Sequence, residues 1–154
     1  MTQMPDPDVV IVDADTVAGW RRVTPSFEQL QAAVADLRAQ APRSTVAIVG
    51  DPALKWALST DDQRLLDDEI NHQRIVLAPA GTRGGHVGFI SAAVQGGAAD
   101  GTAVVVVTDR AIAGCPIARL RREGTRFVFD LANAAETTAT PTTQVHHRRR
   151  RATN

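Results

Sequence analysis

Three acidic residues follow strongly apolar stretches of the chain and are candidates for shared chemistry. Asp13 and Asp15 come at the end of Val9–Val12, and Asp109 follows the run Ala103–Val107 after one threonine. Carboxylate oxygens are hard ligands that suit Mg²⁺ or Mn²⁺. Such an ion polarises a phosphodiester and lowers the pKa of a bound water. The alternative is that each Asp only caps the loop or helix that follows it.

The elements that must position these acids alternate along the chain. Short apolar runs predict strands, and the segments between them, such as Phe27 to Leu37, carry apolar residues at helical spacing. The strands are predicted to begin near Val9, Thr45, Ile75, Ala103 and Arg126. Ile117–Arg122 is predicted to be a short basic helix. This order predicts an α/β fold, a single Rossmann-like, three-layer domain with a parallel central sheet. Parallel strands place their carboxyl ends on one edge, where Asp13 and Asp109 would meet.

The ends of the chain differ from its middle. A length of 154 residues predicts one domain. Residues 1–7 are polar with two prolines and are predicted to be a flexible leader, residues 8–130 form the domain, and residues 131–154 are predicted to be a disordered basic tail. The tail ends in the run Arg148–Arg151, which would add non-specific affinity for nucleic acid.

Composition narrows the cellular setting. The single cysteine, Cys115, excludes a disulfide within the chain, and the zero formal net charge provides no global field toward a polyanion or a membrane. No apolar run approaches the roughly 20 residues that span a bilayer. We therefore expect a cytoplasmic protein without a membrane partner. The oligomeric state stays open, with a homodimer as one alternative.

Several segments resemble, in order, those of one nuclease family. Val10–Ala18 (VIVDADTVA) is similar to the opening motif of NYN-type PIN-like ribonucleases, especially the Regnase-like branch, where an apolar strand ends in Asp-Gly-x-Asn-Val-Ala. Leu58–Leu66 resembles a family segment with Thr-Asp-Gln that opens a helix. Ile75–Pro79 resembles the next family strand, and Val104–Asp109 resembles the strand that carries a catalytic acid.

The resemblance implies an NYN/PIN-like nuclease domain over residues 8–130 that cleaves single-stranded RNA, endonucleolytically, with Mg²⁺ or Mn²⁺. It implies Asp13 and Asp109 as metal ligands and catalytic residues, with Asp15 completing the catalytic acids. The chain departs from the family at three places. Thr16 stands where the family has Asn, and two further family acids fall near Gly85-His86 and Ala113, which carry no carboxylate.

Substrate contacts are expected from residues around the acids. Thr16, Thr108 and Arg110 flank them, and arginine beside a carboxylate site is typical of an enzyme that grips a polyanion. Arg83 lies in a glycine-rich loop whose backbone amides could also contact phosphate. His86 either faces the site, as a phosphate contact or proton donor, or begins a helix and points to solvent.

Two other functions fit the same residues. The missing family acids suit a catalytically degenerate NYN-like module that binds RNA or protein. The pattern Asp13-Ala14-Asp15-Thr16-Val17 is similar to the opening of haloacid-dehalogenase phosphatases, but that family also needs a lysine, and Lys55 is the only one here. Base stacking would require Trp20 or Trp56 to be exposed, whereas burial in the core is the ordinary expectation for both.

Overall fold

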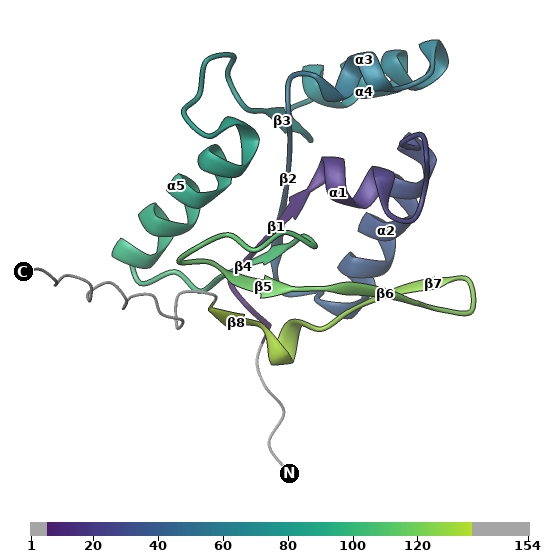
Figure 1. The fold of residues 1–154 in the computed structure, drawn as a ribbon. Helices are drawn as coiled ribbons and strands as arrows, with labels where there is room; N and C mark the ends of the chain where they lie inside the picture. Colours follow the sequence, from purple (N-terminus) through teal and green to yellow (C-terminus); the bar gives the residue numbers. More distant parts are fainter. Residues whose placement is uncertain (1–5, 137–154) are drawn as a thin grey trace, which may run out of the picture.

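The computed structural model describes residues 6–136. A six-stranded sheet has the order β3-β2-β1-β4-β5-β8, and its first five strands are all parallel (Figure 1). The strands of this sheet are β1 (Val9–Asp13), β2 (Thr45–Gly50), β3 (Val76–Leu77), β4 (Val104–Val107), β5 (Pro116–Ala118) and β8 (Ala135–Glu136). The helices are α1 (Ala14–Gly19), α2 (Phe27–Gln40), α3 (Leu54–Ala57), α4 (Thr60–Asn71), α5 (Gly85–Ala99) and the 3-10 helix η1 (Leu131–Asn133).

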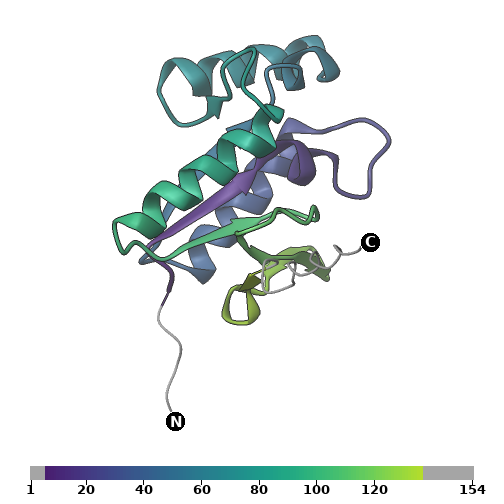
Figure 2. The same cartoon turned by 60° about the vertical axis from the view of Figure 1, so that its left-hand side comes forward.

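Helices cover both faces of the sheet, as the α/β prediction requires. Val10 and Val12 of β1 pack in a cluster with Phe27 and Leu30 of α2, while Ile11 packs in a second cluster with residues of α5 such as Ile90. Alternate residues of one strand thus enter opposite layers. Figures 1 and 2 show α2 and α5 on the two sides of β1. The predicted fold class, a three-layer domain around a parallel sheet, is confirmed.

The register brings the ends of three strands together. Asp13 of β1 lies opposite Val49 of β2, and Val12 lies opposite Val107 of β4. The residues that follow β2 and β4 therefore emerge on either side of Asp13. These residues are Asp51 after β2, and Thr108 and Asp109 after β4.

The prediction for residues 116–129 was wrong in two respects. Ile117–Arg122 is not a helix, because Ile117 pairs with Val106 as the fifth parallel strand, β5, and the chain continues into β6 (Leu120–Glu123). β7 (Arg126–Phe129) does not join the parallel sheet and instead forms an antiparallel hairpin with β6. Gly124, with a positive φ of 63°, makes the tight turn between them. Leu120, Phe127 and Phe129 of this hairpin are buried in the cluster under α2.

The boundaries of the two terminal segments also differ from prediction. At the front, Asp6 accepts a hydrogen bond from the backbone of Arg43, so this leader residue is attached to the domain. At the back, residues 131–136 are not tail, because η1 follows the hairpin and β8 pairs antiparallel with β5. This pairing satisfies backbone groups that β5 would otherwise leave open at the sheet edge. The rest of the predicted leader and tail, including Arg148–Arg151, lies outside the described residues.

Candidate metal centre

Asp13 is the centre of a polar network at the carboxyl edge of the sheet. Its side chain is fully buried and caps α1, accepting hydrogen bonds from the Thr16 backbone amide at 3.3 Å and the Thr16 hydroxyl at 2.8 Å. The Thr108 hydroxyl donates to the same carboxylate at 2.9 Å. Buried carboxylates persist only where hydrogen bonds or cations compensate their charge. Asp13 is therefore both a helix cap and a preorganised acid.

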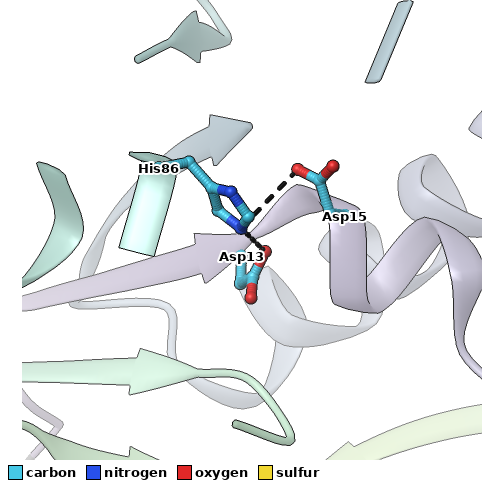
Figure 3. Close-up of side chains that lie close together, drawn as sticks. All are labelled: Asp13, Asp15 and His86. Carbon is cyan, nitrogen blue, oxygen red and sulfur yellow. Dashed lines mark hydrogen bonds and ion pairs between the residues drawn. The ribbon is translucent and has the colours of Figure 1, made fainter. Parts of the chain in front are cut away.

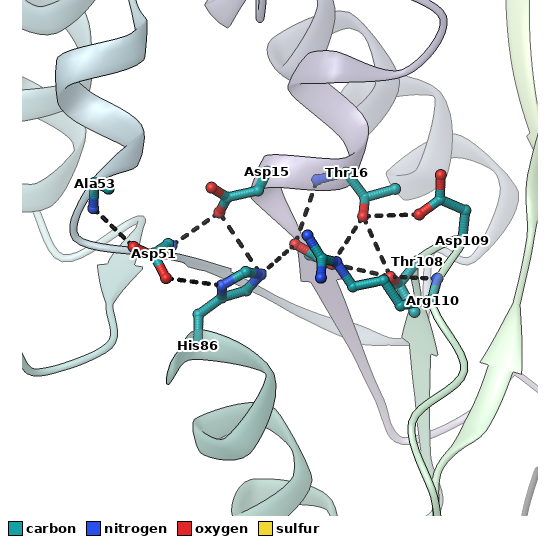
Figure 4. Close-up of polar contacts among 9 residues, drawn as sticks. Asp15, Thr16, Asp51, Ala53, His86, Thr108, Asp109 and Arg110 are labelled. Carbon is teal, nitrogen blue, oxygen red and sulfur yellow. Dashed lines mark hydrogen bonds and ion pairs between the residues drawn. The ribbon is translucent and has the colours of Figure 1, made fainter. Parts of the chain in front are cut away.

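The residues that follow β4 form the solvent-exposed side of the network (Figure 4). Asp109 is exposed, and its Oδ1 lies 3.2 Å from the Thr16 hydroxyl, which links it to Asp13. The Arg110 guanidinium Nε lies 3.7 Å from Asp13 Oδ2, and half of that side chain is exposed. Arg110 thus places a cation at the rim of the acids, where it can meet solvent and a ligand.

His86 reaches the network from the opposite layer. It is the second residue of α5, which begins at two glycines with positive φ, Gly84 (79°) and Gly85 (66°). The imidazole is buried, with the whole residue 6% exposed, and its Nε2 lies 3.1 Å from Asp13 Oδ1 and its Nδ1 3.2 Å from Asp51 Oδ2. Of the two positions predicted for His86, the structure shows the one that faces the site.

Asp15 and Asp51 lie on the other side of the imidazole. Asp15 Oδ1 accepts a hydrogen bond from the Asp51 backbone amide at 2.8 Å and lies 3.9 Å from His86 Nε2. Burial raises the pKa of the Asp15 carboxyl, against the lowering effects of that hydrogen bond and of His86. The pKa of Asp51 is lowered, first by the hydrogen bond from the Ala53 backbone amide and then by His86.

Three of these residues have the geometry of a metal-binding set. Asp13, Asp15 and His86 each offer a ligand atom, and these atoms lie within 4.8 Å of one another (Figure 3). Asp51 holds His86 from the far ring nitrogen, which is the usual position of a carboxylate behind a metal-binding histidine. Two carboxylates and an imidazole form a donor set suited to Mn²⁺, and the imidazole makes the set less typical of Mg²⁺.

The predicted site residues separate into two groups. Asp13, Asp15, Thr16, His86, Thr108, Asp109 and Arg110 are brought together by the contacts above. Arg83 is exposed in the loop before α5, and among residues 6–136 no side-chain hydrogen bond or ion pair joins it to the acids. The predicted ligand Asp109 reaches Asp13 only through Thr16, so its contact with a metal remains a prediction.

Sequence reasoning missed Asp51, although the signal was present. Asp51 directly follows β2 and lies two residues beyond Val49, the register partner of Asp13. Lys55, which the phosphatase alternative requires near the nucleophile, instead pairs with Asp67 on α4 at 2.9 Å. The expected burial of Trp56 was wrong, because this residue is 72% exposed. Trp20 is half-buried and packs against the core cluster.

The raised pKa of Asp15 predicts an unusual effect of its substitution. In the folded protein the ionised form is disfavoured, so stability is lost as pH rises from the ordinary pKa of 3.8 through the raised value. In chelator at pH 7, Asp15→Asn should therefore melt at or above the wild-type temperature, and the difference should vanish below pH 3.8. Added Mn²⁺ should raise the melting temperature of the wild type more than that of the variant. A variant that is less stable than the wild type in chelator at pH 7 would contradict this account of Asp15.

Comparisons with known proteins bear on the fold. No protein-family model matches the chain, and no curated protein matches it. Among solved structures, nuclear proteinaceous RNase P 2 (PRORP2) from A. thaliana matches with a TM-score of 0.57 at 12% sequence identity. The match covers 79% of this chain and 29% of PRORP2, so this chain spans less than a third of that protein. The fold resembles that of part of PRORP2.

The comparison does not extend to finer detail. At 12% identity the match shows a likeness of fold alone, and it does not favour the predicted Regnase-like branch. Within residues 6–136, no helix is both long enough and apolar enough to cross a membrane.

Proposed function

We propose that this protein is a metal-dependent ribonuclease that cuts single-stranded RNA at internal positions. The observation that carries the proposal is the convergence of Asp13, Asp15 and His86 at the carboxyl edge of an NYN-like sheet. Ligands of open parallel sheets bind at this edge. The acids belong to different elements, and their gathering around a buried imidazole exceeds what helix capping requires.

The buried and the exposed residues of the site have different proposed roles. Asp13, Asp15 and His86 Nε2 would hold a divalent ion, with Mn²⁺ favoured by the nitrogen donor. When bound, such an ion supplies Lewis-acid stabilisation of a phosphodiester and activation of water. Asp109 and Arg110 are exposed at the rim, where the arginine would orient the phosphate and the carboxylate would position the attacking water.

Asp51 is proposed to act through His86. Its carboxylate holds Nδ1 and thereby directs Nε2 toward Asp13. Asp51→Asn should weaken Mn²⁺ binding about 10- to 100-fold, which is the range for losing an orienting carboxylate behind a metal-binding histidine. The measurement is a Mn²⁺ titration followed by electron paramagnetic resonance. Asp61→Asn, at an exposed position on α4, is the control for loss of one negative charge. Equal Mn²⁺ affinity in the two variants would show that Asp51 does not support metal binding.

Endonucleolytic cleavage is tested with a closed circular single-stranded RNA, which offers no end to an exonuclease. We expect Mn²⁺ and wild-type protein to produce a full-length linear product first. Degradation of a linear RNA with the same sequence, together with an intact circle, would show that cleavage starts from ends.

One observation favours a second candidate, the degenerate binding module. His86 Nε2 and Arg110 Nε already lie 3.1 Å and 3.7 Å from the Asp13 carboxylate oxygens, so this carboxylate has partners without an ion. Such a protein would bind RNA in chelator, would not bind Mn²⁺, and would cleave nothing.

A further inference from the structure

A polar cavity lies at the far end of α1 from the acids. It has a volume of about 410 Å³ and is formed by the loop between α1 and α2 and by the turn of the β6–β7 hairpin. Its lining residues are Trp20, Arg21, Arg22, Gln29, Arg122 and Gly124. Three of the six are arginines and none is acidic, so the chemistry of the cavity is that of an anion-binding site.

Two of the guanidinium groups are held against aromatic rings. Arg21 lies 4.5 Å from the centre of the Trp20 ring, and Arg122 lies 4.7 Å from the centre of the Phe127 ring. The two rings contact each other edge to face at 5.8 Å. Stacking of this kind orients a guanidinium while its N–H groups stay free for an anion.

Hydrogen bonds to backbone carbonyls hold the loop between α1 and α2, which carries Arg21 and Arg22. The Gln29 side-chain amide donates to the carbonyls of Val17 and Trp20, both at 2.9 Å. Arg21 has a φ of 55°, a conformation uncommon for residues other than glycine. Arg22 Nε donates to the Thr24 carbonyl at 2.9 Å. The arginines of this loop are therefore positioned before any ligand arrives.

None of the three arginines of this cavity forms an ion pair with a carboxylate of residues 6–134. Among the side chains of residues 6–134, the arginines within 4.0 Å of a carboxylate are Arg64, Arg74, Arg110 and Arg121. The three arginines of the cavity are not in this set. Gathering three like charges without a counter-charge costs free energy, which a bound anion would recover.

We propose that this cavity binds a backbone phosphate of the same RNA strand whose cleavage is proposed at Asp13. α1 runs from Asp13 at its N-terminal cap to Trp20 at its C-terminal cap and, with six residues, is about 9 Å long. A single strand of a few nucleotides spans this distance. The inference rests on the proposed function only for the identity of the bound strand. By binding one phosphate, the cavity would set how far along the strand the cut falls from that phosphate.

RNA binding in chelator tests the cavity without requiring cleavage. We would measure the fluorescence anisotropy of a labelled single-stranded RNA with the full chain, and compare the triple variant Arg21→Gln/Arg22→Gln/Arg122→Gln with the wild type. We expect the Kd to rise roughly tenfold at about 0.1 M salt, and the slope of log K against log salt to fall by about 0.7, which corresponds to one lost phosphate contact on a single strand. The matched control, Arg38→Gln/Arg43→Gln/Arg64→Gln, removes the same net charge elsewhere and should change the Kd much less.

Trp20 provides a second readout from inside the cavity. The chain has two tryptophans, so Trp56→Phe leaves Trp20 as the single emitter. RNA should quench its fluorescence with the Kd found by anisotropy. Equal loss of affinity in the two triple variants, unchanged Trp20 emission during binding, or no RNA binding by the wild type would overturn the proposal.

The outcome is separable from that of the nuclease proposal. Protein that binds RNA through the cavity but cleaves nothing with metal would refute the nuclease and support the cavity. Protein that cleaves RNA with an unchanged KM after the Arg21/Arg22/Arg122 substitutions would refute the cavity and leave the nuclease.

Discussion

Asp13→Asn is expected to reduce RNA cleavage by at least about a hundredfold while leaving the protein folded. The loss corresponds to a few kcal/mol of electrostatic stabilisation at a metal-centred transition state. The amide conserves the shape of the side chain. An oxygen at the Oδ1 position still accepts from the Thr16 backbone amide and caps α1, while the Thr16 hydroxyl can rotate to accept from the amide NH2 at the Oδ2 position. The measurement is a single-turnover cleavage rate in Mn²⁺, with circular dichroism and a melting curve to establish that the variant is folded.

The matched control for this variant is Asp61→Asn. Asp61 is exposed in the first turn of α4, so its substitution removes the same charge without touching the network. Full activity is expected. Unchanged cleavage by Asp13→Asn would place the catalytic site elsewhere or assign the activity to a contaminant.

Gly88→Ala is expected to destabilise the protein by about 3 kcal/mol, near the upper end of the cost of overpacking. A Cβ at Gly88 would lie 2.0 Å from the backbone oxygen of Arg83, so the first turn of α5 must shift. His86 is in that turn, and its imidazole should leave the position that contacts Asp13. We therefore expect a lower free energy of unfolding in urea together with weaker Mn²⁺ binding.

Gly96→Ala is the control in the same helix. A Cβ at Gly96 meets nothing within 4 Å, and alanine is the better helix former by about 0.5–1 kcal/mol. This variant should be as stable as the wild type or more so, with unchanged Mn²⁺ affinity. Equal effects of the two substitutions would show that α5 does not position His86 through this contact.

The sheet was predictable because its central strands are fully buried. Four consecutive valines form β4, and β1 is nearly as apolar, so both read as strands of a parallel sheet. Their ends then locate Asp13 and Asp109 on one edge. The β6–β7 hairpin was not predictable in the same way, since Leu120–Glu123 contains one apolar residue and two arginines, which fit a short helix equally well.

The position of His86 also depends on tertiary structure. Two glycines with positive φ turn the chain into α5, and glycine in sequence does not reveal the sign of φ. The position of Asp51, in contrast, could have been predicted from the sequence. This residue follows an apolar strand just as Asp13 does, and the same reasoning applied to β2 would have placed it at the edge.

The most direct test of the central claim is the metal dependence of RNA cleavage by the purified wild-type protein. A labelled single-stranded RNA is incubated with Mn²⁺, with Mg²⁺ or with chelator, and the products are separated by size. The Asp13, Asp15 and His86 set predicts cleavage in Mn²⁺, weaker cleavage in Mg²⁺ and none in chelator. RNA that is bound equally well in all three conditions and cut in none would contradict the nuclease account and favour the binding module.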